Sequence, residues 1–178
     1  MRNGLVVLAL TLAGATGLQA QSPSATDPHM EVARRVLTTT PLFDGHNDLP
    51  WAIRGYDAAP HDVVAYDLRK ATPGHTDIAR LKQGMVGAQF WSVYIPASAV
   101  EEGAAKVQLE QIDIANQIFR RYPDVFGPAL TASDVEREFG NGRIASVIGM
   151  EGGHAIENSL GALRAFYDLG VRYVTLTH

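Results

Sequence analysis

Apolar residues gather in four short runs along the second part of the chain. These runs are rich in β-branched and aromatic residues and predict strands at residues 42–44, 85–95, 144–150 and 171–177. The run at 144–150 is apolar almost throughout, which is typical of a strand buried on both faces of a sheet. The chain therefore has regularly placed candidates for the strands of one sheet.

Apolar residues at helical spacing predict five helices around and between these strands. They are expected at about residues 28–39, 76–84, 98–122, 133–140 and 158–170. Asp27 followed by Pro28 is a helix-start signal, and Ser133 with Glu136 has the spacing of a capping box. Residues 54–74 show no sustained period and predict a long loop over the site described next.

Strand and helix alternate four times, which predicts a parallel α/β architecture. In such folds the chemistry collects at the carboxyl ends of the strands. The predicted strand ends carry His46 and Asp48 after the first strand, Glu151 after the third and His178 after the fourth. We therefore expect these side chains to meet at one rim of the sheet.

The residue types at this rim suit a metal ion. In an extended backbone, His46 and Asp48 point to the same side, and together they offer nitrogen and oxygen ligands that zinc accepts. A carboxylate such as Glu151 at the end of an apolar strand is costly unless it is paired or binds a metal. The alternative for Glu151 is a role in capping the next helix or in accepting hydrogen bonds from loop amides.

The remaining histidines are weaker candidates. His178 is either a ligand, a donor to a developing oxyanion or a hydrogen-bonded histidine of the sheet. His154 competes as a ligand but ranks lower, because it lies beyond a pair of glycines. No role is assigned to three further histidines in the predicted tail and loops, His29, His61 and His75.

Composition narrows the class of protein. The 178 residues are 46% hydrophobic and 19% charged, with a net charge of -4, which is typical of one globular domain and not of a nucleic-acid-binding protein. The chain has no cysteine, which excludes disulfides, thiolate metal sites and a cysteine nucleophile. It also lacks a Gly-x-Ser-x-Gly elbow and a phosphate-binding loop.

The amino-terminal residues predict a targeting segment. A positive residue, Arg2, precedes an apolar run at 5–12 that is shorter than the roughly 20 residues needed to span a bilayer. We therefore expect a signal peptide over residues 1–20 and an exported protein, periplasmic or secreted. An uncleaved membrane anchor is the alternative. A tail and helix at 21–40 and a barrel domain at 41–178 complete the expected organisation.

Four short segments form a distinctive set: residues 44–51 (DGHNDLPW), 87–94 (GAQFWSVY), 149–154 (GMEGGH) and 172–178 (RYVTLTH). Together they resemble the membrane dipeptidase (renal-type) family of zinc peptidases. They stand in the order of the family and at about its spacing, and the resemblance covers the chain from about residue 41 to its end. It implies a TIM-type (β/α)8 barrel with two zinc ions that hydrolyses dipeptides, including those with a C-terminal D-residue.

The resemblance also implies roles for single residues. His46 and Asp48 would bind one zinc, and Glu151 would bridge both. His178 would face the substrate and polarise the scissile carbonyl, and a water bridged between the two zincs would be the nucleophile. On this basis Glu151 and His178 are the expected catalytic residues, and His178 is also the expected substrate-binding residue.

The length of the chain departs from the family pattern. A (β/α)8 barrel takes about 250 residues, and four strands cannot close one. We therefore expect the N-terminal half of a barrel, truncated after the fourth strand, without the remaining ligands of the second zinc and inactive alone. The alternatives are another binuclear-metal amidohydrolase, such as a lactonase or deaminase, or a non-catalytic binding protein on the same scaffold.

The expected partner is a dipeptide substrate, with no nucleic acid. A homodimer is left open, and membrane association is expected only if the amino-terminal segment stays uncleaved.

Overall fold

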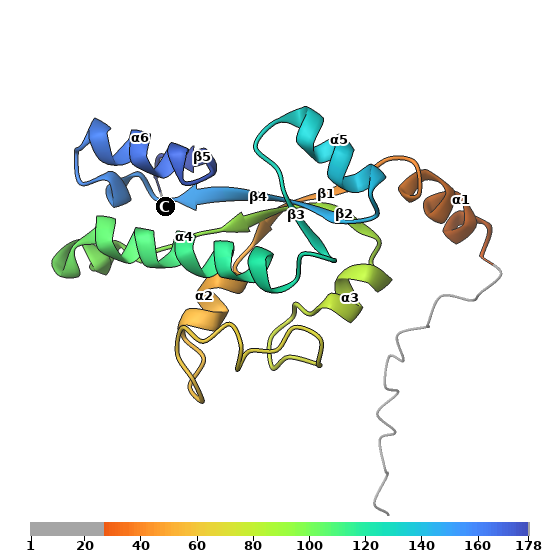
Figure 1. Ribbon diagram of the computed structural model, residues 1–178, viewed down its shortest axis with the longest axis horizontal. Helices are drawn as coiled ribbons and strands as arrows, with labels where there is room; N and C mark the ends of the chain where they lie inside the picture. The colour runs from red at the N-terminus through yellow and green to blue at the C-terminus, as the bar shows by residue number, and fades with distance from the viewer. Residues whose placement is uncertain (1–26, 178) are drawn as a thin grey trace, which may run out of the picture.

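A parallel sheet forms the centre of the protein, seen here in a computed structural model that describes residues 27–177. Four strands lie side by side in chain order, each parallel to the next (Figure 1). They are β1 (Leu42–Asn47), β2 (Val86–Ser92), β4 (Ile144–Glu151) and β5 (Val171–Thr175). Strands that follow one another both in sequence and in space are the arrangement of a (β/α) barrel.

A short fifth strand, β3 (Phe126–Pro128), was not expected from the sequence. It pairs with the beginning of β4, on the edge that β5 pairs with further along. Three residues are too few to show a period in the sequence, which is why β3 escaped prediction. The expected parallel α/β fold is confirmed, but the described sheet has five strands, and the expected fourth strand is β5.

Six α-helices accompany the strands in the described part of the chain. They are α1 (Pro28–Leu37), α2 (Leu49–Arg54), α3 (Ile78–Gln83), α4 (Ala104–Arg121), α5 (Ala132–Gly140) and α6 (Leu160–Asp168). Helix α2 was not expected, and it begins directly after the His46–Asp48 turn. Residues 55–77 form the expected loop. Between residues 27 and 177 no helix combines the length and apolar character needed to cross a membrane.

Two predicted helix starts were wrong. The predicted helix at 98–122 is divided at Gly103, whose positive φ of 91° separates a 3-10 turn (Ala97–Glu102) from α4. The capping box of α5 is formed by Thr131 and Asp134, not by Ser133 and Glu136. The Thr131 side chain accepts from the Asp134 N–H, and the Asp134 carboxylate accepts from the Thr131 N–H, so the helix begins two residues earlier.

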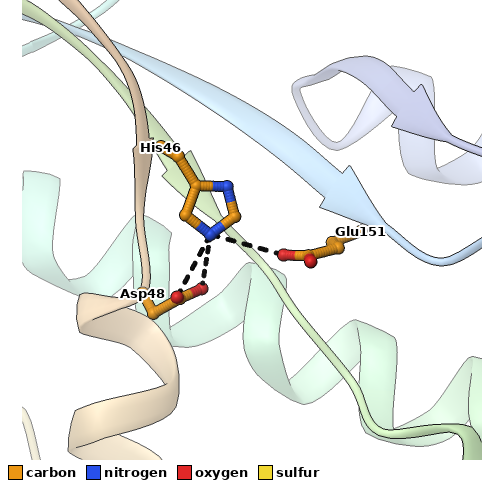
Figure 2. A group of neighbouring side chains, drawn as sticks. All are labelled: His46, Asp48 and Glu151. Atoms are coloured by element: carbon orange, nitrogen blue, oxygen red, sulfur yellow. Dashed lines mark hydrogen bonds and ion pairs between the residues drawn. The ribbon is translucent and has the colours of Figure 1, made fainter. Parts of the chain in front are cut away.

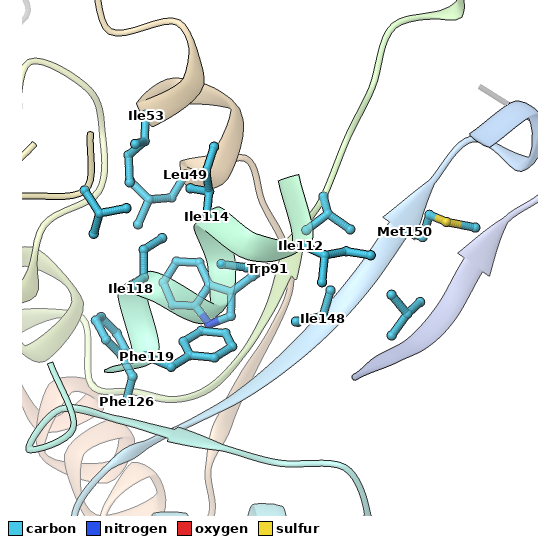
Figure 3. Close-up of a cluster of buried hydrophobic side chains, with 14 of the residues drawn as sticks. Leu49, Ile53, Trp91, Ile112, Ile114, Ile118, Phe119, Phe126, Ile148 and Met150 are labelled. Atoms are coloured by element: carbon cyan, nitrogen blue, oxygen red, sulfur yellow. The ribbon is translucent and has the colours of Figure 1, made fainter. Parts of the chain in front are cut away.

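The main core lies between the sheet and α4 (Figure 3). Trp91 of β2 is fully buried there, and its ring packs edge-on against Phe126 with centroids 5.3 Å apart. The predicted apolar stripe of α4 is buried as expected: Val107, Ile112, Ala115, Ile118 and Phe119. Because side chains alternate along a strand, burying Trp91 on this face turns its neighbours Phe90 and Ser92 to the opposite, inner face. The candidate site lies on that inner face.

The expected signal peptide and His178 lie outside the described residues.

Candidate metal centre

Three of the predicted site residues meet at the carboxyl ends of β1 and β4 (Figure 2). The Nε2 atom of His46 lies 3.1 Å from both carboxylate oxygens of Asp48. The same nitrogen lies 3.4 Å from Oε2 of Glu151. One ligand atom from each of the three residues lies within 4.8 Å of the others. The structure thus brings together His46, Asp48 and Glu151 as the sequence predicted.

The local backbone explains how His46 and Asp48 reach one point. The pairing of β1 with β2 has a register shift between Asp44 and Asn47, at the end of β1. The Asp44 carboxylate accepts a hydrogen bond of 3.1 Å from the His46 N–H and supports this turn. Asp48 stands at the start of α2 but makes no capping hydrogen bond with its side chain. Its carboxylate therefore faces His46 instead of the helix.

Asn47, between the two candidate ligands, ties the turn to its surroundings. Its Nδ2 donates to Oγ1 of Thr76 at 3.1 Å, and its Oδ1 accepts from the N–H of Leu49 at 3.1 Å. No role for Asn47 was predicted from the sequence. Its position between two candidate ligands was the available signal, since its side chain must point away from theirs.

Glu151 is held at the end of β4. Its side chain is only 16% exposed, whereas His46 and Asp48 are about half exposed at 47% and 53%. The hydroxyl of Ser92, the last residue of β2, donates a 3.0 Å hydrogen bond to Oε2 of Glu151. Ser92 was also missed from the sequence, because its contact depends on which residues the strands place opposite one another.

Aromatic rings extend across the inner face beside this cluster. Phe43 stacks on Phe90 with ring centroids 5.0 Å apart, and Phe90 contacts Tyr173 at 4.9 Å. Burial raises the pKa of the Tyr173 hydroxyl, and the negative charges of Glu151 and Asp48 raise it further. Tyr173 therefore lies within the electrostatic reach of both carboxylates and stays neutral.

The other histidines do not join the cluster in the described part of the chain. His154 lies in the 3-10 turn Gly153–Ile156, and its buried Nε2 has no hydrogen-bond partner among the described residues. His75, for which no role was predicted, lines a cavity of about 350 Å³ together with His46 and Asp48. This places the end of the 55–77 loop beside the site.

The donor set fits a divalent metal ion. One imidazole nitrogen and two carboxylates are ligands that zinc accepts, at the number of protein ligands typical of catalytic zinc sites. Two carboxylates close together also repel each other unless a positive charge lies between them. A cation held by His46, Asp48 and Glu151 would remove this repulsion.

Comparison with known proteins places these features in a family. The family model for membrane dipeptidases (peptidase family M19) matches residues 30–178. Dipeptidase verJ of Clonostachys rogersoniana is 43% identical over 162 residues, which are 85% of this chain and 41% of that protein. Dipeptidase ataJ of Aspergillus terreus is 44% identical over 160 residues, 85% of this chain and 38% of that protein. The chain thus spans about two fifths of the length of these relatives.

Solved structures of related proteins agree with this family match. A metallopeptidase of family M19, dipeptidase AC, is 27% identical with a TM-score of 0.64, over 78% of this chain and 43% of its own. A metallopeptidase from Rhodobacter sphaeroides, solved with a phosphinate mimic of the dipeptide L-Ala-D-Ala, is 25% identical with a TM-score of 0.65, over 75% and 44%. The probable dipeptidase PvdM from Pseudomonas aeruginosa, 20% identical over 85% and 38% with a TM-score of 0.68, supports the fold.

Proposed function

From the premise that this chain belongs to the membrane dipeptidase family, peptidase family M19, we propose that the protein hydrolyses dipeptides. The observation that carries the proposal is the convergence of His46, Asp48 and Glu151 at the carboxyl ends of two parallel strands. A family match with a dispersed set of ligands would support the fold only. Here three side chains that could hold one metal ion lie together in the described residues.

Zinc is the metal we propose for this site. His46 and Asp48 would hold one ion, and Glu151 would be a ligand shared with a second ion. When bound, zinc supplies positive charge that acidifies water and polarises a carbonyl oxygen. We also propose that further ligands complete the site of the second ion and that His178 faces the substrate.

The residues of this chain prepare the site for that chemistry. His46 presents Nε2, and not Nδ1, toward both carboxylates. Asp48 and Glu151 bring the negative charge that attracts the metal. Phe90 and Tyr173 place aromatic rings on the neighbouring inner face, and Tyr173 lies within the electrostatic reach of Glu151 and Asp48.

The substrate class follows from the relatives. The Rhodobacter sphaeroides metallopeptidase was solved with a mimic of L-Ala-D-Ala, and two curated relatives are named dipeptidases. We include dipeptides with a C-terminal D-residue in the proposal. The apolar amino-terminal segment supports an exported enzyme that acts outside the cytoplasm.

The test is hydrolysis of L-Ala-L-Ala and L-Ala-D-Ala by the full-length protein, with and without a metal chelator. We expect cleavage of both, loss of activity on chelation and recovery when zinc is added back. Activity that is indifferent to the chelator contradicts the metal mechanism. Hydrolysis of a lactone without any action on dipeptides would favour another amidohydrolase instead. Inactivity on every substrate even with zinc added would favour a binding protein.

A further inference from the structure

We propose that Ser92 is a positioning residue that fixes the Glu151 carboxylate in the orientation in which it binds zinc. The inference rests on the proposed function and deepens it, because it assigns a role to a residue that binds neither metal nor substrate. It predicts that the Ser92 hydroxyl sets the affinity of the site for zinc.

The geometry at Glu151 carries the inference. The Ser92 hydroxyl donates to Oε2 of Glu151 at 3.0 Å, and this same oxygen lies 3.4 Å from Nε2 of His46. The hydroxyl thus holds the oxygen that faces the histidine. Glu151 has several rotatable bonds, so losing this contact should loosen its carboxylate, and ordering it again would oppose metal binding.

The sheet makes Ser92 a rigid support. Ser92 pairs with Gly149 across β2 and β4, and Glu151 lies two residues further along β4 on the same face. The side chain of Ser92 is completely buried. Gly149 has no side chain to separate Ser92 from Glu151, and the ring of Tyr173 fills the space where one would be. Three strands therefore hold the donor and the acceptor in place.

Ser92 differs from another buried serine, Ser146, in the group that accepts its hydrogen bond. Ser146 of β4 is also buried, but its hydroxyl donates to the backbone oxygen of Ile144 at 3.0 Å. A hydroxyl that donates to an ionised carboxylate makes a stronger bond than one that donates to a neutral carbonyl. Partners of this kind typically contribute about 10–100-fold to metal affinity or activity.

The experiment compares Ser92→Ala with the matched control Ser146→Ala in the full-length protein. Zinc dissociation constants are measured by competition with a chelating dye, and kcat and KM are measured with L-Ala-D-Ala at saturating zinc. We expect about 10–100-fold weaker zinc binding for Ser92→Ala and the affinity of the unchanged protein for Ser146→Ala. Ser92→Thr, which keeps the hydroxyl, should restore most of the affinity.

Thermal unfolding of the metal-free proteins separates positioning from folding. If Ser92→Ala does not fold, Ser92→Val, which matches threonine in size but has no hydroxyl, takes its place and should bind zinc more weakly than Ser92→Thr. An unchanged zinc affinity for Ser92→Ala overturns the inference. A loss of affinity at Ser92 that is matched by an equal loss at Ser146 overturns it as well. The inference can fail in this way while chelator-sensitive dipeptide hydrolysis by the unchanged protein still supports the proposed function.

Discussion

Gly149 on β4 lies directly opposite Tyr173 on β5, and the tyrosine ring occupies the space that a side chain at position 149 would need. The ring reaches across β4 and contacts Phe90 of β2. A glycine two residues before Glu151 is therefore required by the packing of the inner face. This relationship connects the first glycine of the 149–154 segment to the site.

Substituting Gly149 with alanine should displace the Tyr173 ring. A Cβ atom at this position would overlap the ring, and such overpacking typically costs about 1–3 kcal/mol of the free energy of unfolding. Denaturant unfolding of Gly149→Ala measures this cost. In a Tyr173→Ala background the same glycine substitution should cost much less, because the ring is gone. Equal costs in the two backgrounds would show that another contact is responsible.

Asp48→Asn should remove zinc from the site without harming the fold. Asparagine keeps the size of the side chain but loses the charge. Loss of a residue that only supports a ligand typically lowers metal affinity about 10–100-fold, and loss of the ligand Asp48 should lower zinc affinity by at least as much. The metal-free protein should be no less stable, because one of two neighbouring negative charges is gone. Asp113→Asn, an exposed change on α4, is the control and should bind zinc normally. Normal zinc binding by Asp48→Asn would exclude Asp48 as a ligand.

Asn47→Ala should destabilise the turn that carries the two ligands. It removes the donor to Thr76 and the acceptor for the Leu49 N–H, and leaving such partly buried groups unpaired costs about 1–3 kcal/mol. Urea unfolding gives the value. Thr76→Val deletes only one of these contacts and should cost less. If Asn47→Ala were as stable as the unchanged protein, the turn would be held by other contacts.

Asp134 should make the stability of the protein depend on pH. The side chain of Arg137 holds the pKa of this carboxyl well below its usual value of 3.8, helped by hydrogen bonds from the Leu130 backbone and Thr131. The folded state thus binds protons less readily than the unfolded state. The stabilisation by Asp134 is present above about pH 4 and is lost as the pH falls through the lowered pKa.

The measurement is the free energy of unfolding of Asp134→Asn and of the unchanged protein from neutral pH downward. The unchanged protein should be the more stable one at neutral pH, and the difference should shrink below about pH 4. A difference that stays constant with pH would mean that the charge of Asp134 contributes nothing. Glu136→Gln, at the position of the wrongly predicted capping box, is the control for charge on α5 and should show no such trend.

Some helix starts could be predicted from the sequence because one strong local signal determines each of them. Asp27 accepts from the His29 N–H at the start of α1, as the Asp27-Pro28 signal predicted. Ser159 accepts from the Ala162 N–H at the start of α6, close to the start of the helix predicted at 158–170. The capping box of α5 was misplaced because Thr131 and Asp134 have the same spacing as Ser133 and Glu136. Where two overlapping residue pairs can each form a capping box, the local sequence does not determine which of them starts the helix.

The sequence by itself determined the parallel α/β fold and the residue types at three strand ends, His46, Asp48 and Glu151. Both follow from the order of strands and helices along the chain, because parallel strands place their carboxyl ends at one edge. Only the tertiary structure decided that Ser92 reaches Glu151 and that the Tyr173 ring lies over Gly149. Those contacts join different strands, and their register is fixed by packing across the sheet, which no local pattern in the chain records.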